Sequence, residues 1–176
     1  MITYDLEMAK WTERKFQAIE DNGLLQGILE RLSGTPARLE YKLNAETLST
    51  LQWKDGQKWS ILEEVGHLSD LESLWSGRID DFTRRLPELR PADMSNTMTK
   101  EAGHNKAKLN DLLAHFRKQR EMLLHKIRYT DQKDLEVVCQ HPRLQTPMRI
   151  IDLAFFVAEH DDHHLAKIQR IQYLLS

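Results

Sequence analysis

The sequence has few of the residues that mark secreted, membrane-bound or nucleic-acid-binding proteins. It has one cysteine, Cys139, so no disulfide can form within the chain. It contains no run of about 18 apolar residues, so we expect no membrane-spanning helix. Its 25 lysines and arginines do not outnumber its 27 aspartates and glutamates, so it lacks the basic surplus that nucleic-acid binding requires. We therefore expect a protein of a reducing compartment, the cytoplasm, with neither nucleic acid nor membrane as partner.

The length and composition fit a single domain spanning residues 1–176. A chain of 176 residues with 40% hydrophobic and 30% charged residues can bury a core without disulfides or structural metals. The first residues form neither a basic segment nor an apolar stretch, so we expect no secretory signal. Glycine (7) and proline (5) are scarce and gather where helical patterns are interrupted.

Apolar residues recur with a helical period in several long segments. Ser60 is the expected N-cap of one of them, and Glu63 completes a capping box there. A weaker pattern over 6–20 predicts a short extra N-terminal helix. The predicted longer helices cover residues 24–32, with a further turn or two up to about residue 48 after an interruption at 33–36, then 60–86, 101–128 and 147–175.

These segments predict an all-α fold, a four-helix bundle. The connection over residues 87–100 is long enough, at roughly 45 Å when extended, to run the length of a bundle. The helices on either side of it can therefore run parallel to each other. The one β-like run, residues 137–139, is too short to predict a sheet.

The clearest functional signal is the polar cluster at residues 159–164, which interrupts an apolar helical pattern. His160 and His164 are four residues apart, so on a helix they lie about 40° apart around the axis. Projection places both on the same side as Leu153, Val157 and Ile168, which is the side that faces the core. Burying such polar groups is costly unless a partner or ligand satisfies them.

A third histidine, His67, lies at the edge of the apolar face of the predicted 60–86 helix. Together with His160 and His164, it could hold a divalent ion such as zinc, nickel or iron, with coordination positions left open for water or substrate. The alternative is that the histidines are structural, since pairs with this spacing occur by chance in many helices.

Other polar residues are candidates for supporting roles. Asp161 and Glu64 could orient the histidine rings or act as a general base. Arg120 and Asn105 project onto the apolar face of the predicted 101–128 helix. They could position an anionic or polar substrate, or make buried structural hydrogen bonds. His141, beside a proline in a loop, could close over a pocket or be exposed.

Three segments, residues 32–39, 59–68 and 158–168, resemble the DinB-like (DinB/YfiT) superfamily. The resemblance implies a four-helix bundle with an up-down-down-up course. It also implies one divalent metal ion, with His67, His160 and His164 at the ligand positions; zinc, nickel, iron and manganese all stay open as its identity. Homodimers are common in such proteins. Their activities include metal-dependent hydrolysis and the transfer of low-molecular-weight thiols onto electrophiles.

The leading hypothesis is a metal-dependent enzyme that acts on a small-molecule substrate. The metal would act as a Lewis acid and activate a water molecule, as in a hydrolase, or a low-molecular-weight thiol, as in a thiol S-transferase. The competing hypothesis is a non-catalytic bundle that dimerises or binds a partner.

Overall fold

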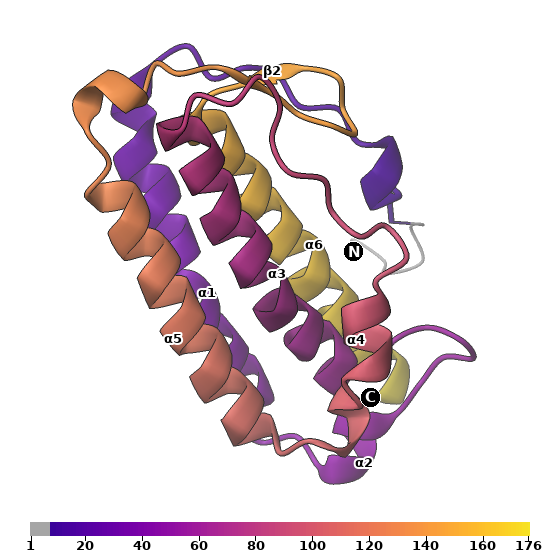
Figure 1. The fold of residues 1–176 in the computed structure, drawn as a ribbon. Helices are drawn as coiled ribbons and strands as arrows, with labels where there is room; N and C mark the ends of the chain where they lie inside the picture. The colour runs from indigo at the N-terminus through magenta and orange to yellow at the C-terminus, as the bar shows by residue number, and fades with distance from the viewer. Residues whose placement is uncertain (1–7) are drawn as a thin grey trace, which may run out of the picture.

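The computed structural model describes residues 8–176, which fold into a bundle of four long helices (Figure 1). This confirms the predicted all-α four-helix bundle. The long helices are α1 (Leu25–Leu43), α3 (Ile61–Thr83), α5 (Leu109–Arg128) and α6 (Ile150–Leu175). The short elements are α2 (Leu48–Gln52), α4 (Thr97–Glu101), the 3-10 turns η1 (Trp11–Glu13), η2 (Asn22–Leu24), η3 (His104–Lys106) and η4 (Gln132–Asp134), and the strands β1 (Cys139–Gln140) and β2 (Pro147–Met148).

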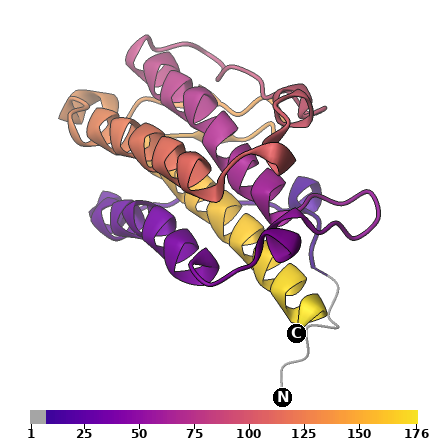
Figure 2. The same ribbon diagram turned by 90° about the horizontal axis from the view of Figure 1, so that it is seen from below.

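The long helices follow an up-down-down-up course, as predicted. α1 and α6 run in one direction, and α3 and α5 run in the other (Figure 1). Each of α1 and α3 packs against both α5 and α6 (Figure 2). The connection from α3 to α5 returns along the bundle and carries α4 and η3. None of the helices in the described part of the chain is both long and apolar enough to cross a membrane.

α3 begins as predicted and ends slightly early. Ser60 Oγ accepts the N–H of Glu63 at 3.2 Å, and Glu63 Oε2 accepts the N–H of Ser60 at 2.8 Å, so the capping box is present. The helix ends at Thr83 rather than at residue 86. Arg85 has a φ of 54°, and this left-handed conformation turns the chain before Pro87.

The predicted interruption at residues 33–36 is wrong, because α1 continues through Pro36. A proline has no N–H, so the carbonyl of Leu32, four residues earlier, loses its helical partner. Arg120 of α5 replaces that partner: its Nη1 donates to Leu32 O at 3.0 Å. A tertiary contact therefore offsets the hydrogen bond that the proline removes.

The predicted N-terminal helix is also wrong for the described residues 8–20, of which only η1 is helical; residues 6 and 7 lie outside the described part. Residues 8–20 run along the bundle with no regular secondary structure other than η1. We call this segment the N-terminal strap. Its apolar residues Trp11, Phe16 and Ile19 pack against the core cluster that contains Phe156. The backbone N–H of Ile19 donates to Asp152 Oδ1 at 2.7 Å. Backbone groups and apolar side chains are thus used in contacts with α6 instead of in a local helix.

Two further sequence expectations need correction. The third long helix begins at Leu109, not at residue 101, because Gly103 adopts a left-handed φ of 67° that breaks the helical path after α4. Residues 137–139 were judged too short for a sheet, yet Cys139 pairs with Met148 in the small antiparallel hairpin of β1 and β2.

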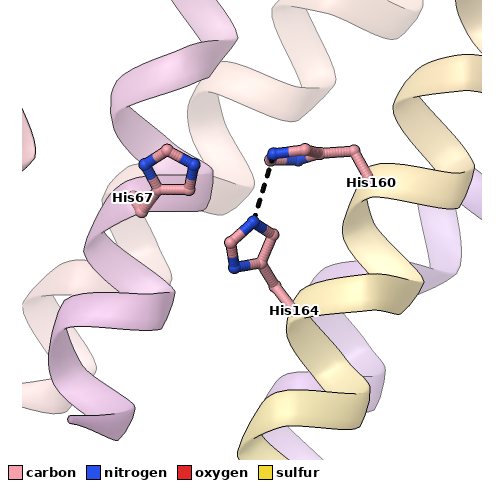
Figure 3. Close-up of side chains that lie close together, drawn as sticks. All are labelled: His67, His160 and His164. Carbon is pink, nitrogen blue, oxygen red and sulfur yellow. Dashed lines mark hydrogen bonds between the residues drawn. The ribbon is translucent and has the colours of Figure 1, made fainter. Parts of the chain in front are cut away.

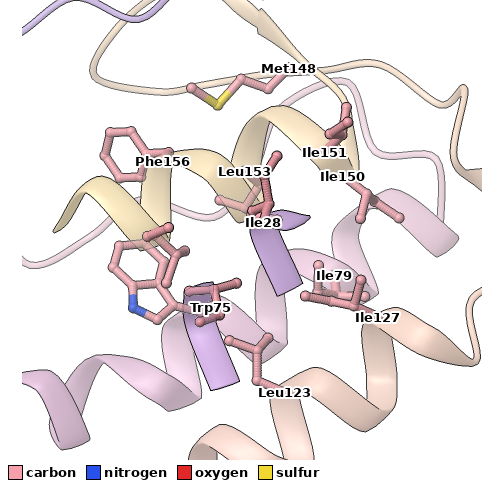
Figure 4. Close-up of a cluster of buried hydrophobic side chains, with 14 of the residues drawn as sticks. Ile28, Trp75, Ile79, Leu123, Ile127, Met148, Ile150, Ile151, Leu153 and Phe156 are labelled. Carbon is pink, nitrogen blue, oxygen red and sulfur yellow. The ribbon is translucent and has the colours of Figure 1, made fainter. Parts of the chain in front are cut away.

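The core consists of two apolar clusters with a polar layer between them. One cluster lies near the β1–β2 hairpin and includes Trp75, Ile79, Ile127 and Phe156 (Figure 4). The other lies at the opposite end of the bundle, around Ile61, Leu113, Phe116 and Ile168. Between them, the long helices contribute buried polar side chains: Thr35, His67, Glu72, Arg120, His160, Asp161 and His164. This layer contains the candidate site.

Candidate metal centre

Three buried histidines converge between α3 and α6. His67 extends from α3, and His160 and His164 extend from successive turns of α6 (Figure 3). Each residue is only 4% exposed. The Nε2 atoms of His160 and His164 lie 3.1 Å apart, and one nitrogen from each of the three rings lies within 4.8 Å of the others. The structure therefore brings together the three histidines that the sequence singled out.

Hydrogen bonds fix the orientation of two of the rings. Glu64 Oε2 lies 2.5 Å from His164 Nδ1, so this nitrogen carries the proton. Thr99 Oγ1 donates its hydrogen to Asp70 Oδ2 at 2.8 Å, so it accepts from His67 Nδ1, 3.1 Å away. In both neutral rings the lone pair is therefore on Nε2, the nitrogen that the outer partners leave free.

His160 is less well satisfied than the other two rings. Its Nδ1 is buried and has no hydrogen-bond partner among the described residues. Its Nε2 faces the Nε2 of His164, which carries a lone pair. Two nitrogens bound at about 2.0–2.1 Å to one ion are about 3.0–3.4 Å apart, close to the spacing seen here. The donor set and its geometry thus fit a shared cation.

Burial keeps the three rings neutral, which is the form that binds metal. It lowers the pKa of His67 to about 4. It also moves the pKa values of His160 and His164 well below their ordinary value, and the neighbouring histidines add to this effect. Burial raises the pKa of Glu64, while the ammonium group of Lys167, 2.6 Å from Glu64 Oε1, acts in the opposite direction.

The histidines line a cavity of about 520 Å³ with largely aromatic walls. The ring of Trp59 lies 4.6 Å from that of His67, measured between centroids. The rings of Trp11 and Trp75 lie 5.0 and 5.7 Å from that of His160. Trp11 belongs to the N-terminal strap, so residues outside the four-helix bundle complete the wall.

Asp161 and Arg120, two of the proposed site residues, bond to each other instead of lining this cavity. Arg120 Nη1 lies 2.5 Å from Asp161 Oδ2, and Arg120 Nη2 lies 3.0 Å from Asp161 Oδ1. Glu72 binds the same guanidinium group, and Thr35 donates to Asp161 at 2.7 Å. All four side chains belong to the polar layer, but the cluster is turned toward α1 and α5, away from the histidines.

Asn105 also lies apart from the cavity. Its Oδ1 accepts from Ser60 Oγ at 2.6 Å, and its Nδ2 donates to the carbonyl of Gln52 at 3.3 Å. These bonds connect η3 to the end of α2 and the start of α3. The side chain therefore makes the structural hydrogen bonds that were the alternative reading of the sequence. Glu64, in contrast, lies against His164 as an orienting group would.

The sequence analysis did not identify Arg78, Arg143 and Lys167, which supply polar groups to the cavity wall. His141, for which closing over a pocket was one of two expectations, also lines the cavity. Arg78 had a usable signal: it follows His67 by eleven residues, about three turns, and so lies about 20° from it around α3. His141 and Arg143 lie in the loop of the hairpin, where helical projection gives no information.

A family model describing the DinB superfamily matches residues 31–168. The chain belongs to the DinB superfamily. The matched segment includes the three histidines and Glu64. Among solved structures, the chain is similar to YfiT from Bacillus subtilis, described as a probable metal-dependent hydrolase with an unusual four-helix bundle topology. The TM-score is 0.78 and the identity is 21%, over 93% of this chain and 94% of that chain. No curated protein matches the chain.

Proposed function

We propose that this DinB superfamily protein is a metal-dependent enzyme whose single divalent ion is held by His67, His160 and His164. The observation that carries the proposal is the convergence of three buried, neutral imidazoles on the wall of one cavity. The ion is zinc, nickel, iron or manganese, and of these imidazole nitrogens suit zinc, nickel and iron best. The description of YfiT as a probable metal-dependent hydrolase supports the same reaction class.

The residues around the histidines would prepare the site before metal or substrate binds. Glu64 holds His164 with its Nε2 lone pair free, and Thr99 does the same for His67. Asp70 fixes Thr99 and also accepts from His104 Nε2 at 2.9 Å. A divalent ion bound there would supply Lewis acidity and lower the pKa of a coordinated nucleophile toward neutrality.

The aromatic walls would help exclude bulk water from the reacting groups. Trp11, Trp59 and Trp75 surround the histidines, and their rings leave a cavity large enough for a small-molecule substrate. The nucleophile is a water molecule in the hydrolase form of the proposal and a low-molecular-weight thiol in the transferase form. Both forms use the same three ligands.

Elemental analysis of tag-free protein tests the metal site directly. We expect about one metal ion per chain in the parent and none in a variant with His67, His160 and His164 all replaced by alanine. His125→Ala, at a histidine that stacks on Tyr129 instead of lining the cavity, is the matched control and should keep the metal. Equal metal content in the parent and the triple variant would contradict the proposal, as would a parent that binds no added zinc, nickel or manganese.

A substrate screen then separates the two reactions. Ester and amide substrates test hydrolysis, and a set of thiols combined with epoxide and halide electrophiles tests transfer. Turnover that requires both the metal and a thiol would support the transferase form and exclude the hydrolase form. Metal-dependent turnover of esters or amides without thiol would do the reverse.

A further inference from the structure

We propose that the far end of this cavity is a subsite for an anionic group of the substrate, bound by Arg78, His141 and Arg143. The inference rests on the proposed function, because it identifies the class of substrate that would reach the metal. The shared chemistry of that group is a set of negatively charged oxygens, as in a carboxylate. The three residues come from α3 and from the hairpin loop that follows β1.

Arg78 is a buried cation that has no bonded carboxylate among the described residues 8–176. It is 1% exposed, and its Nε donates to the carbonyl of Arg90 at 3.0 Å. Asp81, one turn later on α3, accepts from Arg90 through both of its oxygens and forms its ion pair there. Buried guanidinium groups are costly unless an anion is paired with them. Burial accordingly lowers the pKa of Arg78 to about 10.

His141 presents a donor to the same place. Its Nδ1 accepts the backbone N–H groups of Arg143 and Leu144, each at 3.2 Å. The proton of the neutral ring is therefore on Nε2. That Nε2 lies 3.1 Å from Nη1 of Arg78, which is also a donor. Two donors this close to each other need an acceptor beside them, and an anionic oxygen would supply it.

Arg143 adds a third set of donors. Its Nη1 donates to the carbonyl of Thr12 at 2.9 Å, but its Nη2 is buried without any partner among the described residues. One carboxylate, that of Asp93, belongs to the described lining of the cavity, and its oxygens already accept from Ser95 and Thr97. The positive charge of the two arginines is thus not neutralised from within this wall.

The anionic subsite and the histidines are opposite ends of one cavity. Arg78 follows His67 by about 16 Å along α3, on the same face of the helix. Trp75 lies between them: the Arg78 guanidinium carbon is 5.3 Å from its ring centre, and the His160 ring is 5.7 Å from it. The matching substrate has the reacting bond at one end, an apolar or aromatic body, and a carboxylate or similar anion at the other end.

Binding of paired acids and alcohols to metal-free protein tests this subsite. The probes are phenylacetate, 4-phenylbutanoate and 6-phenylhexanoate, each compared with its alcohol by calorimetry; 4-phenylbutylphosphonate tests a phosphorus oxyanion. We expect the parent to bind at least one anion about tenfold more tightly than its alcohol. Arg143→Gln and Arg78→Gln should reduce that preference to within about twofold. Arg117→Gln, at a half-buried arginine outside the cavity that is paired with Glu40, should retain it.

The outcomes distinguish this inference from the proposed function. Equal affinities for anion and alcohol in the parent, a failure of all the probes to bind, or an unchanged preference in Arg143→Gln would overturn the anionic subsite. These results would leave the proposed metal site standing, because metal content is measured separately. An anion preference in a protein that binds no metal would support the subsite and contradict the enzyme proposal. Arg143 is only partly buried, so we expect Arg143→Gln to fold. This variant alone can therefore decide the test if Arg78→Gln does not fold.

Discussion

His160 and Asp161 are neighbours in sequence, and both are buried in the polar layer, yet their surroundings differ completely. Asp161 has both oxygens bonded to Arg120 and a further bond from Thr35. His160 has a buried Nδ1 that finds no hydrogen-bond partner in the described part of the chain. A turn of about 100° around α6 separates them and directs one toward α1 and α5 and the other toward the cavity.

The difference shows which buried groups of the polar layer have all their hydrogen-bond partners among the described residues. Arg120 donates all five of its N–H groups, to Glu72, Asp161 and the Leu32 carbonyl. A network satisfied in this way fixes the packing of the helices. The histidine side has unfilled hydrogen-bonding capacity, which suits a group that binds something from outside.

Breaking the hydrogen-bonded network of Arg120 should give the largest loss of stability. Arg120→Ala leaves the buried carboxylates of Glu72 and Asp161 without their cation, and we expect a loss of about 3–5 kcal/mol in the free energy of unfolding. Arg117→Ala, one turn earlier on α5, breaks an exposed pair with Glu40 and should cost about 0–1 kcal/mol. Urea unfolding followed by circular dichroism measures the stability of both variants. Similar losses in Arg120→Ala and Arg117→Ala would contradict the stabilising role of the buried network.

Lowering the pH should destabilise the protein, because the buried histidines are neutral in the folded state. Unfolded histidine takes up a proton near pH 6.5, whereas burial lowers the folded pKa of His67 to about 4 and moves those of His160 and His164 well below their ordinary value. Stability is therefore full above pH 6.5 and is lost as the pH falls toward the folded values. For metal-free protein we expect a loss of roughly 2 kcal/mol between pH 7 and pH 5 for each ring that stays neutral in the folded state. The triple alanine variant should show a shallower decline in urea unfolding, and equal slopes would argue against buried neutral rings.

Weakening an outer partner of the histidines should give the smallest effect. Glu64→Gln replaces the charged acceptor of His164 Nδ1, and we expect metal affinity to fall by about 10–100-fold. Asp162→Asn changes a carboxylate on α6 between the two histidines, but one that pairs with Arg31 and Arg38. Its metal affinity, measured by competition with a chromogenic chelator, should equal that of the parent. A Glu64→Gln variant with parental affinity would remove Glu64 from the site.

The sequence predicted the histidine cluster because the signal is local. A spacing of four residues and an apolar helical period place His160 and His164 on the inner face of α6 without knowledge of other helices. The same projection put Asp161 and Arg120 near the core but did not say that they face each other. That pairing depends on which helices are neighbours. For this reason projection could not show that the two side chains lie outside the cavity lining.

Other differences have the same origin in tertiary contacts. Proline normally ends a helix, but Arg120 supplies the donor that lets α1 pass through Pro36. The N-terminal strap owes its conformation to α6, not to its own weak period. The DinB superfamily resemblance predicted the parallel course of α3 and α5, which the long connection only permitted. The homodimer and the cytoplasmic location that were expected from the sequence stay predictions.

Glu64 and His164 touch across the site although 100 residues separate them along the chain. Synthesis proceeds at about 5–20 residues per second, so the α6 histidines are made about 5–20 seconds after His67. During that interval the half-made chain has one of the three imidazoles. Metal capture would therefore follow the docking of α6, and the ion acquired would depend on which metals are available to the finished fold.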